Sequence, residues 1–227
     1  MKDFIKPDLA RVGRCGIPEI VYGAGKSPGE LIDISRAFLE DQGRVIITRL
    51  DESRVEELRA SFESVDNVVL EHNERAGTLV LRNKDLESMG YGTVGLITAG
   101  TSDIPVAEEA RVILKELGCE TRVSYDVGIA GIHRVFDALK SLSGVDLFIV
   151  VAGMEGALPS VVAGLVDKPV IAVPSSVGYG TGEKGFAALN TMLNSCTPLA
   201  VVNVDNGFGA ASIALRILRL CDSIKNE

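Results

Sequence analysis

Two side chains in this sequence are candidates for covalent and proton-transfer chemistry. Cys196 lies in the polar stretch Asn194 to Thr197, and its thiolate would be a nucleophile. Glu155 interrupts a turn of small residues and could serve as a general base if apolar surroundings raised its pKa. Both have structural alternatives. Glu155 could cap a helix or stabilise its N-terminus by charge, and most cysteines with apolar neighbours are inert core residues. A helix C-terminus before Cys196 does not favour a thiolate.

Four turns rich in glycine, alanine and serine surround these candidates. They are Thr98-Ala-Gly-Thr-Ser-Asp103, Asp126-Val-Gly-Ile-Ala-Gly131, Gly153-Met-Glu-Gly156 and Pro174-Ser-Ser-Val-Gly-Tyr-Gly180. Such turns let a ligand approach the backbone, and we expect Gly100, Thr101, Ser102, Asp103, Asp126 and Gly153 to bind substrate. A helix that begins at Ser102 or Asp103 would offer free N–H groups to a phosphate. The alternative is that one of these two residues only caps its helix.

Three basic residues lie in or beside these turns. His133 and Arg134 begin the helix after the second turn, and Lys184 lies in the Gly-rich segment from Gly178 to Gly185. A lone histidine is usually structural, but one next to an arginine at a ligand-facing turn could meet an anion or move a proton. The Gly-rich segment is not interpreted as a dinucleotide fingerprint, because it comes late in the sheet instead of at the first turn. We expect a flexible loop with Lys184 available for an anion.

The elements that would position these residues follow a regular alternation. Short β-branched runs begin at Thr93, Thr121, Asp146, Lys168 and Pro198, and amphipathic stretches separate them. Five strands alternating with five helices predict a three-layer, doubly wound parallel sheet with helices on both faces. In such sheets ligands bind at the carboxyl ends of the strands, where the four turns lie. Cys196 precedes its strand, so we expect it at the opposite end of the sheet.

The first 90 residues differ from the rest of the chain in composition and pattern. They are more charged, and Ser27, Pro28 and Glu30 form a capping-box signature for a helix that ends at Gly43. A strand from Arg44, a helix from near Asp51 and two further strand-like runs follow. We therefore predict a smaller N-terminal α/β domain over residues 1–90, a linker at residues 84–92 and the larger domain over residues 91–227.

Composition narrows the function classes. The net charge of −8 and the absence of tryptophan argue against a nucleic-acid surface. No apolar run reaches the ~18 residues of a membrane span, and the N-terminus does not resemble a secretion signal. The four cysteines are scattered, without metal-ligand spacing, as is typical of free thiols in a reducing compartment. We expect a cytoplasmic protein that binds neither membrane nor nucleic acid.

The larger domain resembles the AIR-carboxylase (PurE) family. "TAGTSDIPVAEEA" resembles that family's first turn, "YDVGIAGIHR" its segment ending in His-Arg, and "VVAGMEGALPSVVAGLVDKPVIAVP" its Gly-rich turn and following strand. Two features depart from the purine enzymes. Their "GGAAHLPG"-like turn here reads "GMEGALPS", and their His-Arg is followed by Thr-Pro, here by Val135-Phe136.

The segment "RCGIPEIVYGAGKSP", from Arg14 to Pro28, is foreign to those carboxylases and closely resembles the LarB family. These are the pyridinium-3,5-biscarboxylic acid mononucleotide synthases, in which an N-terminal domain precedes a PurE-like domain. The resemblance implies carboxylation of nicotinic acid adenine dinucleotide by CO2 or bicarbonate and hydrolysis of its phosphoanhydride, which releases AMP. The product would feed synthesis of a nickel-pincer nucleotide cofactor.

The same resemblance implies the roles of the site residues. Cys196 matches the family's covalent cysteine and Glu155 its acidic partner. His133, Arg134 and Lys184 would neutralise phosphate or carboxylate, with Arg14 and Lys26 as further candidates. The PurE fold implies a homo-octamer with sites at subunit junctions, where a neighbouring chain could supply Cys196. No organic cofactor or dedicated metal site is expected, and Mg2+ would be the metal that assists hydrolysis.

Two other functions are also compatible with the sequence. The first is an aminoimidazole ribonucleotide carboxylase or mutase of purine synthesis, for which Cys196 would be dispensable. The second is a nucleotide-binding regulator that binds without turnover.

Overall fold

The computed structural model describes residues 5–86 and 90–225. The chain divides into two compact units, Met1–Glu87 and Ser88–Glu227. The division falls within the predicted linker at residues 84–92, of which residues 87–89 lie outside the described part. None of the helices in residues 5–86 and 90–225 combines the length and the apolar character of a membrane span.

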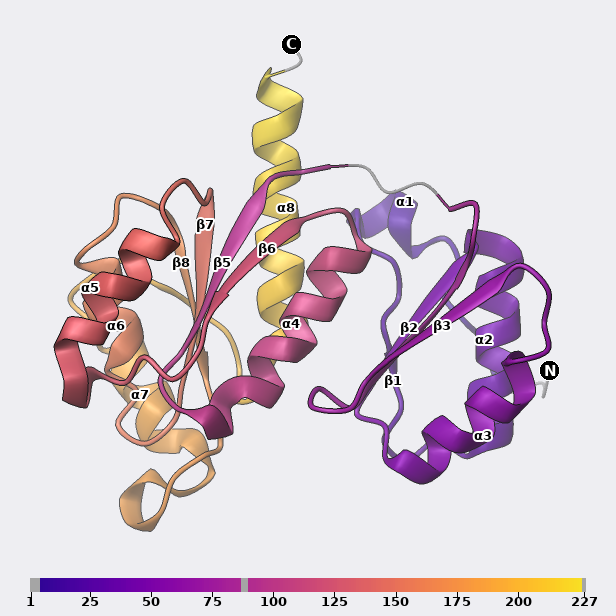
Figure 1. The fold of residues 1–227 in the computed structure, drawn as a ribbon, viewed down its shortest axis with the longest axis horizontal. Coiled ribbons are helices and arrows are strands. Elements are labelled where there is room, and N and C mark those ends of the chain that lie inside the picture. Colours follow the sequence, from indigo (N-terminus) through magenta and orange to yellow (C-terminus); the bar gives the residue numbers. More distant parts are fainter. Residues whose placement is uncertain (1–4, 87–89, 226–227) are drawn as a thin grey trace. The chain divides into compact units, whose positions relative to one another are not determined.

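The N-terminal unit is a four-stranded mixed sheet covered by helices (Figure 1). Its elements are α1 (Arg11–Cys15), β1 (Val21–Tyr22), α2 (Pro28–Gln42), β2 (Arg44–Thr48), α3 (Glu52–Phe62), β3 (Val68–Asn73) and β4 (Thr78–Asn83). The strand order is β1-β2-β4-β3, with β1 parallel to β2 and the other pairs antiparallel. The predicted capping box is confirmed, because Ser27 accepts from the Glu30 N–H while the Glu30 carboxylate accepts from the Ser27 N–H.

Two short elements of this unit were not predicted. The two-residue strand β1 and the end of helix α1 lie in the segment quoted for the LarB resemblance. Residue patterns this short do not predict a helix or a strand. Strand β1 forms because Val21 and Tyr22 pair with Ile47 and Thr48 of β2.

The larger unit confirms the predicted doubly wound parallel sheet. Its elements are β5 (Thr93–Thr98), η1 (Thr101–Asp103), α4 (Ile104–Glu116), β6 (Glu120–Ser124), η2 (Ile129–Gly131), α5 (Ile132–Ser141), β7 (Leu147–Ala152), α6 (Leu158–Ala163), β8 (Val170–Pro174), η3 (Gly180–Gly185), α7 (Phe186–Leu193), β9 (Ala200–Val201) and α8 (Gly207–Lys225). The strand order is β6-β5-β7-β8-β9, and all pairs are parallel. The order reverses between β5 and β7, which is where such sheets bind ligands.

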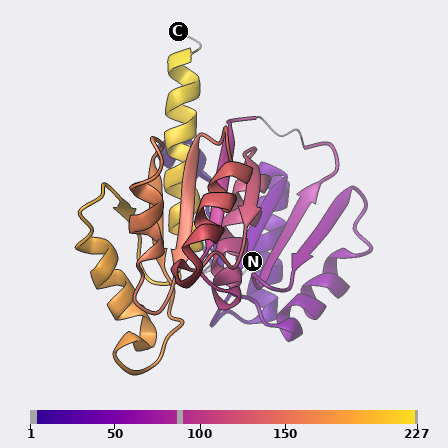
Figure 2. The same cartoon turned by 60° about the vertical axis from the view of Figure 1, so that its left-hand side comes forward.

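Helices cover both faces of this sheet, as Figures 1 and 2 show. Helices α5, α6 and α7 share one core with the sheet, built around Val135, Val150, Leu158 and Met192. Helices α4 and α8 pack together on the other face. Strands β7 and β8 are buried along their whole length, which explains their continuous apolar sequences. The C-terminal end of α8 extends beyond the sheet in both views.

Two elements are shorter than their sequence patterns indicate. The run from Pro198 to Asp205 forms only the two-residue edge strand β9, and the chain then turns at Asp205, which has a positive φ of 54°. Helix α6 begins at Leu158, so Glu155 belongs to the turn that precedes it.

Candidate functional site

A cleft of about 570 Å³ lies at the carboxyl ends of the strands of the larger unit. This volume is within the usual range for small-molecule sites. The cleft is lined by Ala99, Gly100, Thr101, Ser102, Asp103, Asp126, Gly128, Ile129, Ala130, Ala152, Gly153, Met154, Glu155, Ala157, Leu158 and Val177. It therefore brings together seven of the residues expected from the sequence: Gly100, Thr101, Ser102, Asp103, Asp126, Gly153 and Glu155. The turns after β5, β6 and β7 form most of its wall.

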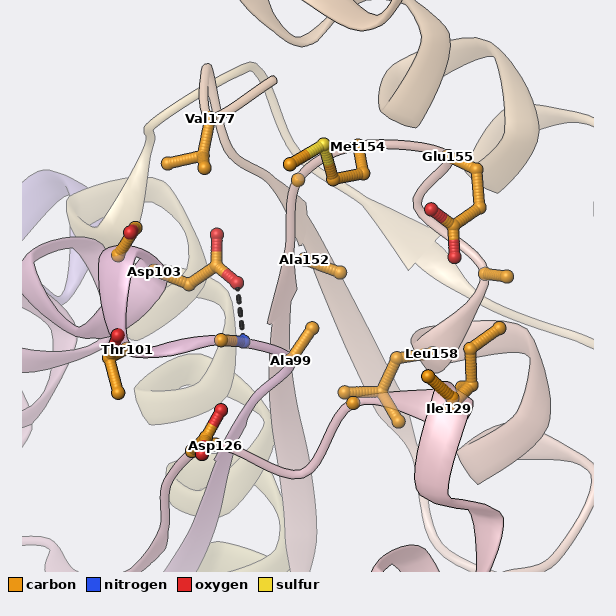
Figure 3. Close-up of a pocket in the computed structure, with 16 residues that line it drawn as sticks. Ala99, Thr101, Asp103, Asp126, Ile129, Ala152, Met154, Glu155, Leu158 and Val177 are labelled. Atoms are coloured by element: carbon orange, nitrogen blue, oxygen red, sulfur yellow. Dashed lines mark hydrogen bonds between the residues drawn. The ribbon is translucent and has the colours of Figure 1, made fainter. Parts of the chain in front are cut away.

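Asp103 holds three of the turns together. Its carboxylate accepts a hydrogen bond from the Gly100 N–H at 2.8 Å (Figure 3). It also accepts from the Ser175 hydroxyl at 2.5 Å and from the Gly153 N–H. Asp103 is 3% exposed, and burial raises the pKa of its carboxyl above the ordinary value, a rise that these hydrogen bonds oppose. The expectation that Asp103 contacts substrate gains no support from this geometry, because its oxygens are directed at the protein. Thr101 and Ser102 remain exposed at the mouth of the cleft.

The turn after β7 is possible only with glycine at Gly153. A Cβ there would lie 2.3 Å from the Val177 carbonyl oxygen and 2.7 Å from the Ser175 hydroxyl. The next residue, Met154, has a φ of 52° and donates its N–H to Val177 at 2.7 Å. The turns after β7 and β8 are therefore joined backbone to backbone, which fixes the wall on which Glu155 lies.

Asp126 lies in the turn after β6 with a φ of 59°, a conformation uncommon for residues other than glycine. Its N–H donates to the Thr98 hydroxyl at 3.1 Å. Arg134 donates to the Asp126 carbonyl at 2.8 Å, and its guanidinium lies 3.5 Å from the Asp126 carboxylate. Arg134 does not line the cleft but braces the turn that does.

Glu155 lies across the cleft from Thr101 and Asp103, near Leu158 and Ile129 (Figure 3). It is exposed, and α6 has no side-chain cap, so the capping alternative for Glu155 is wrong. This wall thus combines one carboxylate with apolar groups.

Cys196 is exposed and does not line the cleft. It lies in the loop between α7 and β9, at the end of the sheet opposite the cleft, as its position before the strand predicts. The loop is fixed, because the Ser160 hydroxyl of α6 donates to Ser195 at 2.8 Å and Thr197 donates to the Ser160 carbonyl at 3.2 Å. In contrast, Cys119 is buried, and burial raises the pKa of its thiol to about 11.

The remaining predicted residues also lie outside the cleft lining. His133 and Lys184 are exposed, and Lys184 has a φ of 62° within η3. In the N-terminal unit, Arg14 pairs with Asp8 at 2.6 Å and Lys26 donates to the Tyr22 carbonyl at 2.8 Å.

Sequence reasoning missed Ser175 and Val177 as site residues. Both belong to the turn after β8, one of the four turns rich in small residues. Their contacts with Asp103, Gly153 and Met154 depend on the lateral order of the strands.

The described residues contain no group of three or more His, Cys, Asp or Glu side chains that could hold a metal ion. The lining includes three carboxylates, Asp103, Asp126 and Glu155, and no basic side chain among its described members.

Comparisons with known proteins agree with both parts of this architecture. The model of the AIR carboxylase family matches residues 93–227, and the model of the LarB/PurE-like N-terminal domain matches residues 1–84. The protein "Uncharacterized protein MJ0165" of Methanocaldococcus jannaschii is 46% identical over 225 residues, which cover 97% of this chain and 86% of that protein.

Other similar proteins match the larger unit alone. An N5-carboxyaminoimidazole ribonucleotide mutase of Methanocaldococcus jannaschii is 38% identical over 135 residues, covering 56% of this chain and 79% of the mutase. The crystal structure of Treponema denticola PurE is 27% identical, with a TM-score of 0.49, and covers 59% of this chain and 87% of that one. The N-terminal domain followed by the PurE-like domain places this chain in the LarB family.

Proposed function

We propose that this protein carboxylates the pyridinium ring of nicotinic acid adenine dinucleotide with CO2 or bicarbonate and hydrolyses the phosphoanhydride. The products are pyridinium-3,5-biscarboxylic acid mononucleotide, a precursor for the nickel-pincer nucleotide cofactor, and AMP. The observation that carries the proposal is the pairing of the LarB-type N-terminal domain with a PurE-like cleft that has Glu155 on its wall.

The chemistry requires a nucleophile and a base. A pyridinium ring is electron-poor, so its carbon 5 does not attack CO2. If the Cys196 thiolate adds to a ring carbon, the C–S bond forms and the ring becomes a neutral dihydropyridine, an enamine nucleophilic at carbon 5. Carbon 5 then forms a bond to CO2, Glu155 removes the proton from that carbon, and the thiolate leaves as aromaticity returns. Covalent catalysis thus divides one difficult step into easier ones.

Within one chain Cys196 lies outside the cleft, so we propose that a neighbouring chain supplies the thiol. Two observations support a partner at this surface. The thiol is exposed on a fixed loop, and large apolar side chains are exposed near it in the chain, with Phe186 63% and Leu193 62% exposed on α7. Such residues are typical of a surface covered by another subunit. A homo-octamer of the kind expected from the PurE resemblance would provide the required junctions.

The acidic lining of the cleft favours the cationic part of the proposed substrate over its phosphates. The ring of the proposed substrate is cationic and would be favoured near Glu155, whereas its phosphates need donors. Thr101 and Ser102 offer hydroxyl groups, and the exposed His133 and Lys184 are basic groups for phosphate in the assembled oligomer. Mg2+ carried by the phosphates would add positive charge.

A second candidate is the carboxyaminoimidazole ribonucleotide mutase reaction, favoured by the name of the 38% identical relative. It leaves the N-terminal domain and the exposed Cys196 without a role. It predicts turnover of the imidazole substrate and full activity when Cys196 is replaced.

One experiment separates these functions. The purified full chain is incubated with nicotinic acid adenine dinucleotide and 13C-bicarbonate, with and without Mg2+, and the products are identified by mass spectrometry. We expect AMP and a labelled pyridinium dicarboxylate. Turnover of carboxyaminoimidazole ribonucleotide alone would support the mutase, and binding of nucleotide without any product would support a regulator.

A further inference from the structure

Outside the cleft, three polar side chains form a network between α4 and the end of β6. Arg111 donates two hydrogen bonds to the Glu108 carboxylate, from Nε at 2.6 Å and from Nη2 at 2.7 Å. The Tyr125 hydroxyl donates to Oε1 of the same carboxylate. Glu108 is only 7% exposed, so its charge is compensated inside the fold by these two donors.

The Tyr125 hydroxyl is suited to act as a permanent hydrogen-bond donor to Glu108. Burial and the Glu108 carboxylate raise the pKa of Tyr125 above its ordinary value, so the hydroxyl keeps its proton at physiological pH. A two-point guanidinium–carboxylate pair also has a defined orientation, which fixes the acceptor in space. The network therefore holds the Tyr125 side chain against α4.

Tyr125 directly precedes the turn that forms one wall of the cleft. Asp126, Gly128, Ile129 and Ala130 of this turn line the cleft, and Asp126 has the positive φ described above. Arg134 braces the same turn from the α5 side, and Thr98 holds it from β5. Tyr125 adds a third attachment, to α4.

We propose that Tyr125, held by Glu108 and Arg111, is a positioning residue that sets the wall from Asp126 to Ala130 and thereby the affinity of the cleft for substrate. None of the three side chains lines the cleft, so the effect passes through the backbone of the turn. As a statement about catalysis, the inference rests on the proposed function; as a statement about the order of the turn, it does not.

Tyr125→Phe tests the proposal, because it keeps the ring and removes the donor. Glu108→Gln tests the charge of the acceptor, because glutamine keeps an acceptor oxygen but weakens the hydrogen bonds from Tyr125 and Arg111. The matched control is Glu109→Gln, which changes a neighbouring buried carboxylate that accepts from the Phe208 N–H of α8 at 3.3 Å. Hydrogen exchange of the peptide spanning residues 125–131 and steady-state kinetics with the dinucleotide are measured on the full chain of all three variants and the wild type.

We expect faster exchange over residues 125–131 in Tyr125→Phe and Glu108→Gln than in Glu109→Gln. The KM should rise roughly tenfold while kcat stays within about twofold, because the wall contributes equally to binding of substrate and transition state. Unchanged exchange in Tyr125→Phe, or the same rise in KM for Glu109→Gln, would overturn the positioning role. If the wild type forms no product, the proposed function fails, and the exchange comparison alone decides the inference.

Discussion

The Ser175 hydroxyl donates to the Asp103 carboxylate at 2.5 Å, joining the end of β8 to the turn after β5 across 72 positions of the chain. Both residues are buried, and the same carboxylate also accepts from the turn after β7. The cleft is thus built on a buried carboxylate that ties three loops of the sheet edge.

Replacing Ser175 by alanine should destabilise the larger unit by about 1–3 kcal/mol at neutral pH, because a buried carboxylate loses a donor. The folded-state pKa of Asp103 is already raised, so this group favours the folded state at low pH and loses that contribution as pH rises through the folded pKa. Removing Ser175 raises the pKa further, and the deficit should shrink on acidification. Urea unfolding at neutral and mildly acidic pH measures the free energy of unfolding of Ser175→Ala and wild type, with the exposed Ser176→Ala as the control. A loss of stability that does not depend on pH would contradict this role of Asp103.

Two glycines of the cleft should respond differently to alanine. A Cβ at Gly153 would overlap the Val177 carbonyl, so Gly153→Ala must displace the turn that carries Glu155. A Cβ at Gly100 meets only Asp103 Oδ2 at 3.6 Å, and its φ of −132° suits any residue. We expect Gly153→Ala to lose about 2 kcal/mol or more of stability and Gly100→Ala less than about 1 kcal/mol. Thermal unfolding compares them, and equal losses would refute the packing argument.

Glu155→Gln should lower kcat by about 10²- to 10⁴-fold, the usual contribution of a general base. Nucleotide affinity should fall much less than kcat, because glutamine keeps the shape of the side chain and Asp126 still leaves a carboxylate in the lining. The control is Glu183→Gln, an exposed carboxylate in η3 that does not line the cleft. Kinetics and calorimetry on both variants separate the two effects, and unchanged kcat in Glu155→Gln would remove the base from the mechanism.

Much of this site follows from the sequence because strand and helix periods are local. The alternation from Thr93 predicts the parallel sheet and places four small-residue turns at one edge, and seven expected residues meet there. The inward orientation of Asp103 could not be predicted from local sequence, because it depends on a hydrogen bond from Ser175, 72 positions along the chain. Arg134 was expected at the ligand but braces the turn at Asp126, because a long side chain can fold back onto nearby carbonyls. The strand β1 was not predicted for a similar reason, because it forms only through pairing with β2.

Complementation between two inactive variants tests whether the site needs two chains. Cys196→Ser and Glu155→Gln are co-expressed and purified together. If chains mix at random and a neighbour supplies the thiol, about a quarter of the sites hold both native residues. Activity should return to about a quarter of the wild-type value. Light scattering should show an oligomer. If one chain supplied both residues, no site in the mixture would be complete, and activity would stay at the level of the single variants.

The most direct measurement of the central claim is the intact mass of the protein quenched during turnover of nicotinic acid adenine dinucleotide. We expect a fraction of chains to carry the mass of a pyridine nucleotide, mapped to the peptide that contains Cys196 and missing in Cys196→Ser, which should also lose carboxylation. Wild-type turnover by Cys196→Ser, with no adduct on the native chain, would contradict covalent catalysis by this thiol.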